Sequence, residues 1–349
     1  MLYLVDNRFS ALLYFAYKSG MEGNRVTIKE KVAELLLRHR GEYISGEEMA
    51  RHLGVSRAAV WKAVKQLESE GMCIQAATNR GYALSDAADI LSSACISGYL
   101  RHPEVFAIQV EKTLDSTNRL ARDLAQRGGR EGTVVVAGEQ TAGRGRLGRS
   151  FFSPGGTGVY FSLVLRPSPE TEASLLTTAA AVAVAQAAEE LAGRPAEIKW
   201  VNDIYMDGKK ICGILTEGTY SIEEGRMESA VLGIGVNVSP PAEGFPEELR
   251  KKAGTILEKP GNNARSRLIA WILEIFWEYY ENLDAGTFYS EYRRRSLLLG
   301  KRVEILGKGR REPAEVLDIG RDFSLILQKK NGEIERLRAG EVEICYGKK

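Results

Sequence analysis

The sequence is poor in the two residues that most often hold a metal ion, with four cysteines and three histidines among 349 residues. The cysteines stand far apart and form no Cys-x-x-Cys pair, which argues against a zinc site and favours the reducing cytoplasm. His39, His52 and His102 are equally scattered, so neither a histidine triad nor a metal cluster is expected. We therefore predict that the protein binds no structural metal.

An excess of charge of one sign is also absent, because 48 lysines and arginines are balanced by 46 aspartates and glutamates. The formal net charge of +2 excludes an argument for a nucleic-acid partner from bulk electrostatics, so such binding has to come from a local element. No run of residues reads as a membrane span, and the apolar stretch from Ala11 to Tyr17 is too short for one. We expect no membrane partner.

The length predicts more than one domain, because 349 residues exceed what one ordinary hydrophobic core holds. Residues 1–25 are interpreted as an extension that is either disordered or the product of an upstream start site, with Met21 directly before the first domain. Ser85–Asp89 is a short polar linker. We expect an α+β multidomain protein, with a helical unit at 26–85, an α+β unit at 90–296 and a β unit at 298–349.

The first unit has the spacing of a helix-turn-helix followed by a β-hairpin, which together make a winged helix. Ser45 is expected to cap one helix, and after the turn at Gly54 a second helix runs from Arg57 to Ser69. Apolar residues recur at helical spacing in the second helix, and a hairpin with Arg80 near its tip follows. The apolar positions are Val60, Trp61, Val64 and Leu67; the candidate DNA-binding residues are Ser56, Arg57, Trp61, Lys62, Lys65 and Arg80.

The charge of this unit limits how strongly one copy can bind DNA. Between Val26 and Ser85, nine lysines and arginines stand against seven glutamates, a net charge of only +2. A monomer with so few phosphate contacts is expected to bind weakly, so two copies on a two-fold operator are predicted. A helical protein-interaction module is the alternative.

A glycine loop with three arginines is the most informative feature of the second unit. In Gly143–Arg149 the glycines let backbone N–H groups approach an anion, and guanidinium groups bind carboxylate or phosphate in a bidentate way. The loop also matches Gly-x-Gly-x-x-Gly, yet the strand-like run Thr157–Leu165 follows where a dinucleotide-binding turn would open a helix. This argues against a nicotinamide-dependent enzyme, and leaves a plain basic surface loop as the alternative.

Further motifs surround the loop in a fixed order. Ser116-Thr117-Asn118 and Gln140 precede it, and Lys199–Asp203, Lys209–Ile214 and Leu232–Asn237 follow it. From about residue 26 to the C-terminus this series resembles the biotin–protein ligases, and with the helix-turn-helix it is most similar to the bifunctional biotin ligases that also repress the biotin operon. The resemblance implies a winged helix-turn-helix, a central class II synthetase-like domain and a C-terminal SH3-like β-barrel.

The resemblance also implies the reaction and the partners. Biotin's carboxylate attacks the α-phosphate of ATP, supplied with Mg²⁺, pyrophosphate leaves, and the biotinyl-AMP formed biotinylates one lysine of a biotin carboxyl carrier protein domain. The same chain binds operator DNA as a homodimer that the ligand promotes, and it represses biotin genes.

Two anions meet in this reaction, so the site has to neutralise a carboxylate and a phosphate together. The candidate catalytic residues are Arg146, Lys210 and Asp203; by resemblance Lys210 bridges the two anions, and Asp203 orients Lys210 or the incoming amine. Where Phe151 stands, relatives carry a tryptophan that stacks on adenine, which predicts weaker ATP binding here. The candidate biotin-binding residues are Ser116, Thr117, Asn118, Gln140, Arg144, Gly145, Arg146, Lys210 and Gly213, and those for ATP or the adenylate are Gly143, Arg144, Arg146, Arg149, Phe151, Asn202, Gly233 and Asn237, the last reading the adenine edge.

Several simpler interpretations remain open at this point. Ser116–Asn118 could be only a helix cap, Asp203 part of a turn, and Lys210 a surface lysine. A lipoate–protein ligase would need an arginine-rich Gly-Gly-Gly element with a following His-Asp, which the sequence lacks. A transcription factor whose central domain only senses a metabolite would have no need of Arg146 and Lys210.

Overall fold

The computed structural model describes residues 27–39, 41–69, 74–84, 89–220, 227–259, 261–283, 286–307, 310–338 and 340–345. The extension expected at residues 1–25 and most of the expected linker lie outside the described residues. The described chain separates into two compact units. The first comprises the residues up to Val110 together with Lys259–Glu274, and the second comprises Glu111–Glu258 and the chain from Ile275 onward. These two units do not coincide with the three domains predicted at 26–85, 90–296 and 298–349, so those domain boundaries stay a prediction.

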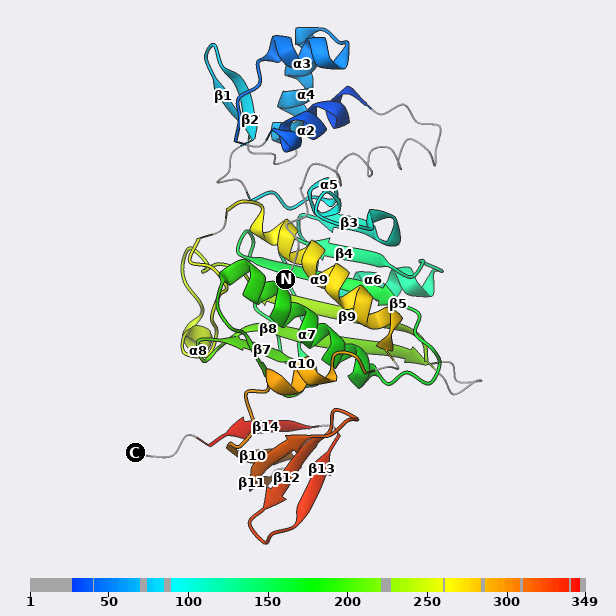
Figure 1. Cartoon of the computed structure of the whole chain (residues 1–349), viewed down its shortest axis with the longest axis vertical. Helices are drawn as coiled ribbons and strands as arrows, with labels where there is room; N and C mark the ends of the chain where they lie inside the picture. The colour runs from blue at the N-terminus through cyan, green and yellow to red at the C-terminus, as the bar shows by residue number, and fades with distance from the viewer. Residues whose placement is uncertain are drawn as a thin grey trace. The chain divides into compact units, whose positions relative to one another are not determined.

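The helix-turn-helix and its wing are present in the first unit (Figure 1). Ser45 caps the middle helix, since its hydroxyl accepts a hydrogen bond from the backbone N–H of Glu48 at 3.1 Å. Gly54 ends that helix in the left-handed conformation, with a φ of 65°. The elements are α2 (Ile28–Arg38), α3 (Gly46–Leu53), α4 (Arg57–Ser69), β1 (Ile74–Ala77) and β2 (Gly81–Leu84).

Helix α4 buries only part of its expected apolar face. Val60 and Val64 are fully buried, and Leu67 is 5% exposed. Trp61, expected at an apolar position of the same helix, is instead 55% exposed. It lies at the edge of the apolar stripe, where helical spacing alone does not decide burial, and Ala63 takes a place in the core.

The remainder of the first unit ties the end of the linker to the start of a long helix. The Asp89 carboxylate accepts from the Arg265 side chain at 2.6 Å and from its backbone N–H at 3.1 Å. Asn263 accepts from the backbone N–H of Ile90 at 3.0 Å. The elements here are α5 (Ser93–Ser97), a 3₁₀ turn (Pro103–Val105), β3 (Ala107–Glu111) and α9 (Ala264–Glu281), whose last turns belong to the second unit.

A seven-stranded sheet carries the α+β architecture, in the order β3-β4-β5-β9-β8-β7-β6 (Figure 1). All eight residues of β5 are buried, which requires cover on both faces. Helix α6 packs against β4, β5 and β9, and helix α7 packs against β6 to β9. The bounds are β4 (Thr133–Ala137), β5 (Gly158–Leu165), β6 (Glu197–Lys199), β7 (Asp203–Met206), β8 (Lys209–Tyr220), β9 (Met227–Asn237), α6 (Thr117–Gln126), α7 (Ala173–Ala192) and α8 (Glu247–Arg250).

The register divides the two faces of the sheet by chemistry. Phe161 lies opposite Ile234, and Leu163 opposite Leu232, so large apolar side chains share one face. At two of the alternate positions the β5 residue faces a glycine of β9: Ser162 lies opposite Gly233, and Tyr160 opposite Gly235. On this second face Val135, Val164 and Val231 pack with Ala121 and Ala125 of α6. The glycines leave space there that the apolar face does not have.

Helix α7 is long and apolar enough by composition to cross a membrane, but 67% of its most apolar window is buried within the protein. Its alanines and valines from Ala179 to Ala185 are all fully buried. Together with its packing against the sheet, this identifies α7 as a core helix of the second unit.

The C-terminal β unit is a five-stranded antiparallel sheet in the order β13-β12-β11-β10-β14, joined to the rest by α10 (Tyr289–Arg294). The sequence pattern predicts four short strands between Arg302 and Leu337; the fifth strand of the structure is β14, which pairs with β10. The α+β multidomain fold is thereby confirmed. The strands are β10 (Arg302–Gly307), β11 (Arg310–Ile319), β12 (Leu325–Lys329), β13 (Ile334–Leu337) and β14 (Glu341–Ile344).

Candidate active site and nucleic-acid interface

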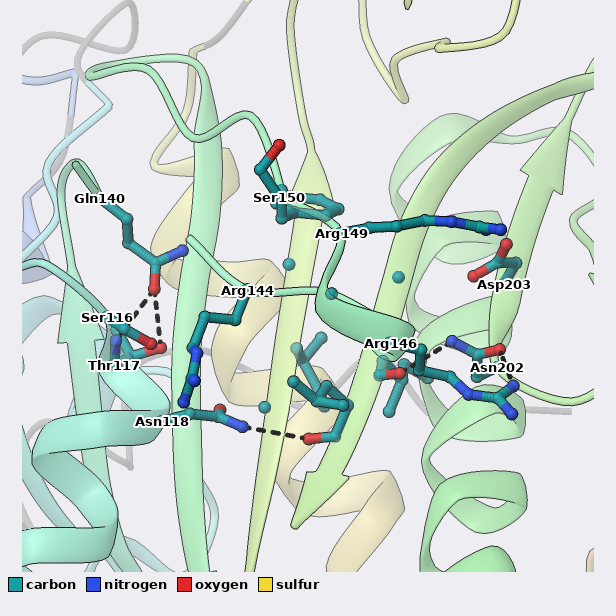
Figure 2. A pocket seen from close by; sticks show the side chains of 18 of the residues that line it. Ser116, Thr117, Asn118, Gln140, Arg144, Arg146, Arg149, Ser150, Asn202 and Asp203 are labelled. Carbon is teal, nitrogen blue, oxygen red and sulfur yellow. Dashed lines mark hydrogen bonds between the residues drawn. The ribbon is translucent and has the colours of Figure 1, made fainter. Parts of the chain in front are cut away.

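A pocket lies on the glycine-bearing face of β8 and β9, beneath the arginine loop (Figure 2). It gathers residues from segments that are far apart in the sequence, and most of the expected site residues are among them. The lining consists of Ser116, Thr117, Asn118, Gln140, Arg144, Gly145, Arg146, Arg149, Ser150, Phe151, Asn202, Asp203, Lys210, Gly213, Ile214, Leu215, Gly233, Ile234 and Gly235.

Glycine is required in the floor of this pocket because other side chains already occupy the space above it. A Cβ atom on Gly233 would lie 1.9 Å from Asn118 Oδ1, and one on Gly235 would lie 2.6 Å from the Phe151 ring. Gly213 is less constrained, with Lys210 and Phe151 atoms at 3.4 Å. The β9 glycines therefore admit one polar and one aromatic side chain to the same floor.

Ser116, Thr117 and Asn118 begin helix α6, and all three are nearly buried. Ser116 occupies the N-cap position, yet its side chain makes no capping hydrogen bond. Gln140 Oε1 accepts from the backbone N–H of Thr117 at 2.9 Å and lies 3.2 Å from Thr117 Oγ1. The motif is thus both a helix start and a pocket wall, and the interpretation as a simple cap does not account for Ser116.

The arginine loop is closed by its own backbone. Gly145 N–H donates to the Arg149 carbonyl at 2.7 Å, and Phe151 N–H donates to the Gly143 carbonyl at 2.9 Å. A Cβ atom on Gly143 would lie 2.4 Å from the Phe151 carbonyl oxygen, so this glycine is needed for loop closure and does not line the pocket. A short 3₁₀ turn (Arg146–Gly148) sits inside the loop and strand β5 follows it, as the sequence predicted.

Arg146 is the arginine of this loop whose contacts reach farthest across the site. Its Nη1 donates to Asn202 Oδ1 at 2.9 Å, and Asn202 Nδ2 donates to the Ile214 carbonyl at 2.9 Å (Figure 2). Its Nη2 lies 3.4 Å from the Gly340 carbonyl of the C-terminal β unit. Arg144 and Arg149 are more exposed and point to opposite sides of the pocket (Figure 2).

Two hydrogen bonds made by the residues before Asn202 and Asp203 tie this turn to α10 and to the C-terminal β unit. The Trp200 indole N–H donates to the Phe323 carbonyl at 2.9 Å, and the Tyr292 hydroxyl donates to the Val201 carbonyl at 3.1 Å. Burial raises the pKa of Tyr292, so this phenol stays protonated and remains a donor. The motif is thereby fixed at the pocket rim.

Lys210 and Asp203 form an ion pair across the β7–β8 hairpin, with 2.6 Å between Nζ and Oδ1. Both side chains are partly exposed, at 34% and 22%, so the pair is open to the pocket. The neighbouring Cys212 is fully buried, and desolvation raises the pKa of its thiol although Lys210 acts in the opposite direction. Cys212 is therefore an uncharged core residue and no nucleophile.

Two expected site residues lie outside the lining. Gly143 serves loop closure, and Asn237 donates from Nδ2 to the Gly254 carbonyl at 3.1 Å. Gly254 in turn donates to the Lys210 carbonyl at 2.8 Å, so Asn237 supports the segment beside Lys210. The predicted site residues did not include Ser150, Ile214, Leu215 and Ile234, which also line the pocket. The alternation of β8 and β9 places Leu215 and Gly235 on the same face as Gly213 and Gly233.

The expected DNA-binding residues all lie on the exposed surface of the winged helix. Ser56 directly precedes α4, and its hydroxyl accepts from the Ala59 N–H at 3.2 Å. Lys65 pairs with Glu68 at 2.7 Å, and this hydrogen bond raises the lysine pKa. In the wing, the Arg80 guanidinium lies 4.3 Å from the centre of the Tyr43 ring. Trp61 is an exposed aromatic residue on the same helix as the exposed Arg57 and Lys62.

Comparison with known proteins agrees with this arrangement. A model of the Biotin/lipoate A/B protein ligase family matches residues 110–237, and one of the HTH domain matches residues 29–83. The Bifunctional ligase/repressor BirA of Bacillus subtilis (strain 168) is 40% identical over 262 residues, which cover 74% of this chain and 80% of that protein. The protein of the same name from Escherichia coli (strain K12) is 27% identical over 331 residues, covering 93% and 99%.

A solved structure extends the likeness to the fold. Biotin protein ligase from Aquifex aeolicus, in complex with biotin and ATP, superposes with a TM-score of 0.57 at 28% identity and covers 68% of this chain and 98% of its own. The family model spans the arginine loop and the strands that form the pocket, and the HTH model spans the winged helix. On this similarity in sequence and fold, the chain belongs to the biotin/lipoate A/B protein ligase family and, within it, to the bifunctional ligase/repressors.

Proposed function

We propose that the protein is an ATP-dependent biotin–protein ligase and a biotin-responsive repressor of biotin genes. The observation that carries the ligase function is the pocket itself, which has the neutral groups of Ser116–Asn118 and Gln140 at one end and Arg146 at the other, with Lys210 also in its lining (Figure 2). An uncharged ureido ring fits the first end, and a carboxylate next to a phosphate fits the second.

The reaction follows from this division of the pocket. A carboxylate oxygen of biotin attacks the α-phosphorus of ATP, the bond to the β-phosphate oxygen breaks, and pyrophosphate leaves. Lys210 neutralises the two anions as they meet, and the Arg146 guanidinium holds the phosphate of biotinyl-AMP. The amine of a carrier lysine then attacks the acyl carbon, AMP leaves, and the amine loses its proton. Asp203 orients Lys210 or this amine through its carboxylate.

The nucleotide supplies its own metal ion in this scheme. Among the described residues no cluster of three or more metal-binding side chains exists, and Asp203 is the single carboxylate in the lining. Mg²⁺ keeps several waters and binds chiefly through substrate phosphates, so these residues fit a cation that arrives with ATP and neutralises phosphate charge. Phe151, packed over Gly213 and Gly235, supplies the aromatic surface for adenine.

The repressor function is supported by the winged helix and by the named activity of the relatives. The modest charge of this unit favours two copies on a two-fold operator, and a homodimer promoted by biotinyl-AMP would supply them. The other partner is the biotin carboxyl carrier protein domain, and the cytoplasm, where cysteines stay reduced, is the expected compartment.

Incubation of the purified protein with biotin, ATP and a biotin carrier domain tests the ligase function directly. We expect biotinyl-AMP in the protein-bound fraction and a mass increase of one biotin on one carrier lysine. A parallel reaction with lipoate should give no transfer. Transfer of lipoate in preference to biotin, or ligand binding without any adenylate, would contradict the proposal.

A further inference from the structure

A continuous chain of hydrogen bonds leads away from the pocket wall through Ser162 to Glu217, two residues that have no role in the proposed reaction. Thr117 Oγ1 lies 2.8 Å from Ser162 Oγ, which lies 2.6 Å from Asn118 Oδ1. Asn118 Nδ2 donates to Glu217 Oε2 at 2.8 Å. Ser162 is fully buried and Asn118 is 4% exposed, so water cannot replace these contacts.

The number of hydroxyl and amide protons determines which group donates and which accepts at each step of the chain. Asn118 Nδ2 faces two acceptors, Glu217 Oε2 and the Leu215 carbonyl at 3.3 Å, so its Oδ1 must face Ser162. Ser162 has one hydroxyl proton and gives it to Asn118 Oδ1, which leaves its oxygen to accept from Thr117. Two hydroxyl oxygens 2.8 Å apart need a proton between them, so Thr117 gives its proton to Ser162, whereas Gln140 Oε1 at 3.2 Å still accepts from the Thr117 backbone N–H. Every donor therefore points from the pocket toward Glu217.

The direction of these hydrogen bonds makes the Thr117 hydroxyl an acceptor at the pocket end of the chain. A hydroxyl that donates a hydrogen bond becomes a better acceptor, and the low local polarity of a buried chain strengthens the effect. Thr117 Oγ1 therefore presents its lone pairs toward the pocket, next to the carbonyl oxygen of Gln140 (Figure 2). A ligand edge with N–H groups meets acceptors there.

Glu217 ends the chain as a charged group that is held in place from the other side. Its Oε1 lies 3.7 Å from Arg122 Nη1 and 3.8 Å from Arg144 Nη1, and its side chain is 28% exposed. Arg144 comes from the arginine loop and points toward Asn118 (Figure 2). The two guanidinium groups attract Oε1 from one side while Oε2 stays with Asn118.

We propose that Glu217 is a positioning residue for biotin, whose negative charge orients the chain Thr117–Ser162–Asn118 so that the Thr117 hydroxyl accepts from a ureido N–H. Ser162 is the relay. This inference rests on the proposed ligase function and names how the neutral end of the pocket recognises its substrate. Neither residue touches the substrate.

Glu217→Gln tests the role of the charge, because it keeps the shape of the side chain while its amide no longer fixes the direction of the chain. We expect the KM for biotin to rise about tenfold, the usual effect of losing one hydrogen bond that a charged group strengthens, here the bond from the ureido N–H to Thr117. The KM for ATP and the kcat at saturating biotin should stay nearly unchanged, and so should the melting temperature. Glu228→Gln is the matched control, since this glutamate is exposed on the neighbouring strand β9.

Ser162→Ala provides an independent test, because it interrupts the chain and leaves Glu217 in place. It should also raise the KM for biotin, and this result replaces that of Glu217→Gln if the latter variant melts at a lower temperature. Both changes interrupt the same chain of hydrogen bonds. The KM for biotin of the double variant should therefore be no higher than that of the more impaired single variant. An unchanged KM for biotin in Glu217→Gln, or additive effects in the double variant, would overturn the inference. Absence of biotinyl-AMP with the wild-type chain would contradict the proposed function, and the inference with it, before any variant is compared.

Discussion

Lys210 Nζ lies 2.6 Å from Asp203 Oδ1, so the cation proposed to bridge the two reacting anions has a carboxylate partner before any substrate binds. A pair that is about one quarter to one third exposed contributes little to folding. The ion pair instead positions Lys210, because the Asp203 carboxylate holds this flexible side chain at the pocket rim. There the ammonium group can exchange Asp203 for the anion of a bound substrate. The relationship therefore concerns catalysis more than stability.

Lys210→Ala is expected to lower the rate of adenylate formation by roughly 10²–10³, the usual cost of one group that stabilises transition-state charge. The melting temperature should hardly change, because the pair is open to solvent. Single-turnover formation of biotinyl-AMP measures the effect, and Lys209→Ala, at the exposed neighbouring position, is the control. A near wild-type rate in Lys210→Ala would show that the bridging role is misassigned.

Arg146→Gly should weaken retention of biotinyl-AMP, because the guanidinium fork that holds the phosphate and Asn202 would be lost. Released anhydride would then biotinylate lysines of unrelated proteins. Labelling of a bystander protein mixed with the carrier domain measures the leak, and Arg146→Lys, which keeps the charge without the fork, should fall in between. Biotin confined to the carrier lysine would count against this role.

Gly233→Ala tests the close packing of the pocket floor. The new Cβ atom would fall 1.9 Å from Asn118 Oδ1, so Asn118 has to leave its partners, at a typical cost of about 1–3 kcal/mol in stability. Biotin binding, measured by calorimetry, should weaken more than ATP binding. Gly235→Ala, which meets the Phe151 ring instead, should show the opposite preference. Equal losses for both ligands in both variants would disprove the division of the pocket.

Much of the site could be predicted because its signals are local. The arginine loop followed by a strand is written in contiguous glycines and β-branched residues, and Ser116–Asn118 opens a helix. The burial of Val60 against the exposure of Trp61 could not be read in the same way, because both fit helical spacing and only packing decides between them.

The other omissions arise from contacts between distant parts of the chain. Asn118 and Glu217 are separated by 99 positions, and nothing near either residue indicates the other. Asn237 was expected at the adenine edge, but the segment that contains Gly254 takes its side-chain amide. Strand β14 alternates glutamate with valine and isoleucine over only four residues, too short a pattern to stand out.

Acid should weaken the contact between α10 and the C-terminal sheet. The Arg293 side chain donates to the Asp318 carboxylate at 2.7 Å, and this hydrogen bond lowers the carboxylate's pKa. A lowered pKa in the folded state gives stability that is present at neutral pH and is lost as the pH falls through the folded-state value. Asp318→Asn should therefore reduce the melting temperature by at most a few degrees at pH 7, and by less at an acidic pH well below the usual aspartate pKa of about 3.9, where the wild-type carboxylate takes up its proton as well. An equal difference at both pH values would exclude this linkage.

Biotinyl-AMP is expected to strengthen operator binding by promoting dimerisation. The winged helix has too little net charge to hold an operator as one copy, whereas two copies on a two-fold site double the contacts. The adenylate would contact the Gly143–Arg149 loop, in which Leu147 is 75% exposed, and an ordered loop can meet a second chain at a lower entropic cost. Ligand and operator are then coupled reciprocally.

Sedimentation velocity and operator binding, each measured with and without biotin plus ATP, test this coupling. The wild-type chain should shift from monomer to dimer and bind its operator more tightly when both substrates are present. Lys210→Ala is the informative control, because it should fail to respond to biotin and ATP yet dimerise with added biotinyl-AMP. A monomer that binds its operator equally well under all conditions would contradict the mechanism and leave the winged helix as an unregulated DNA-binding unit.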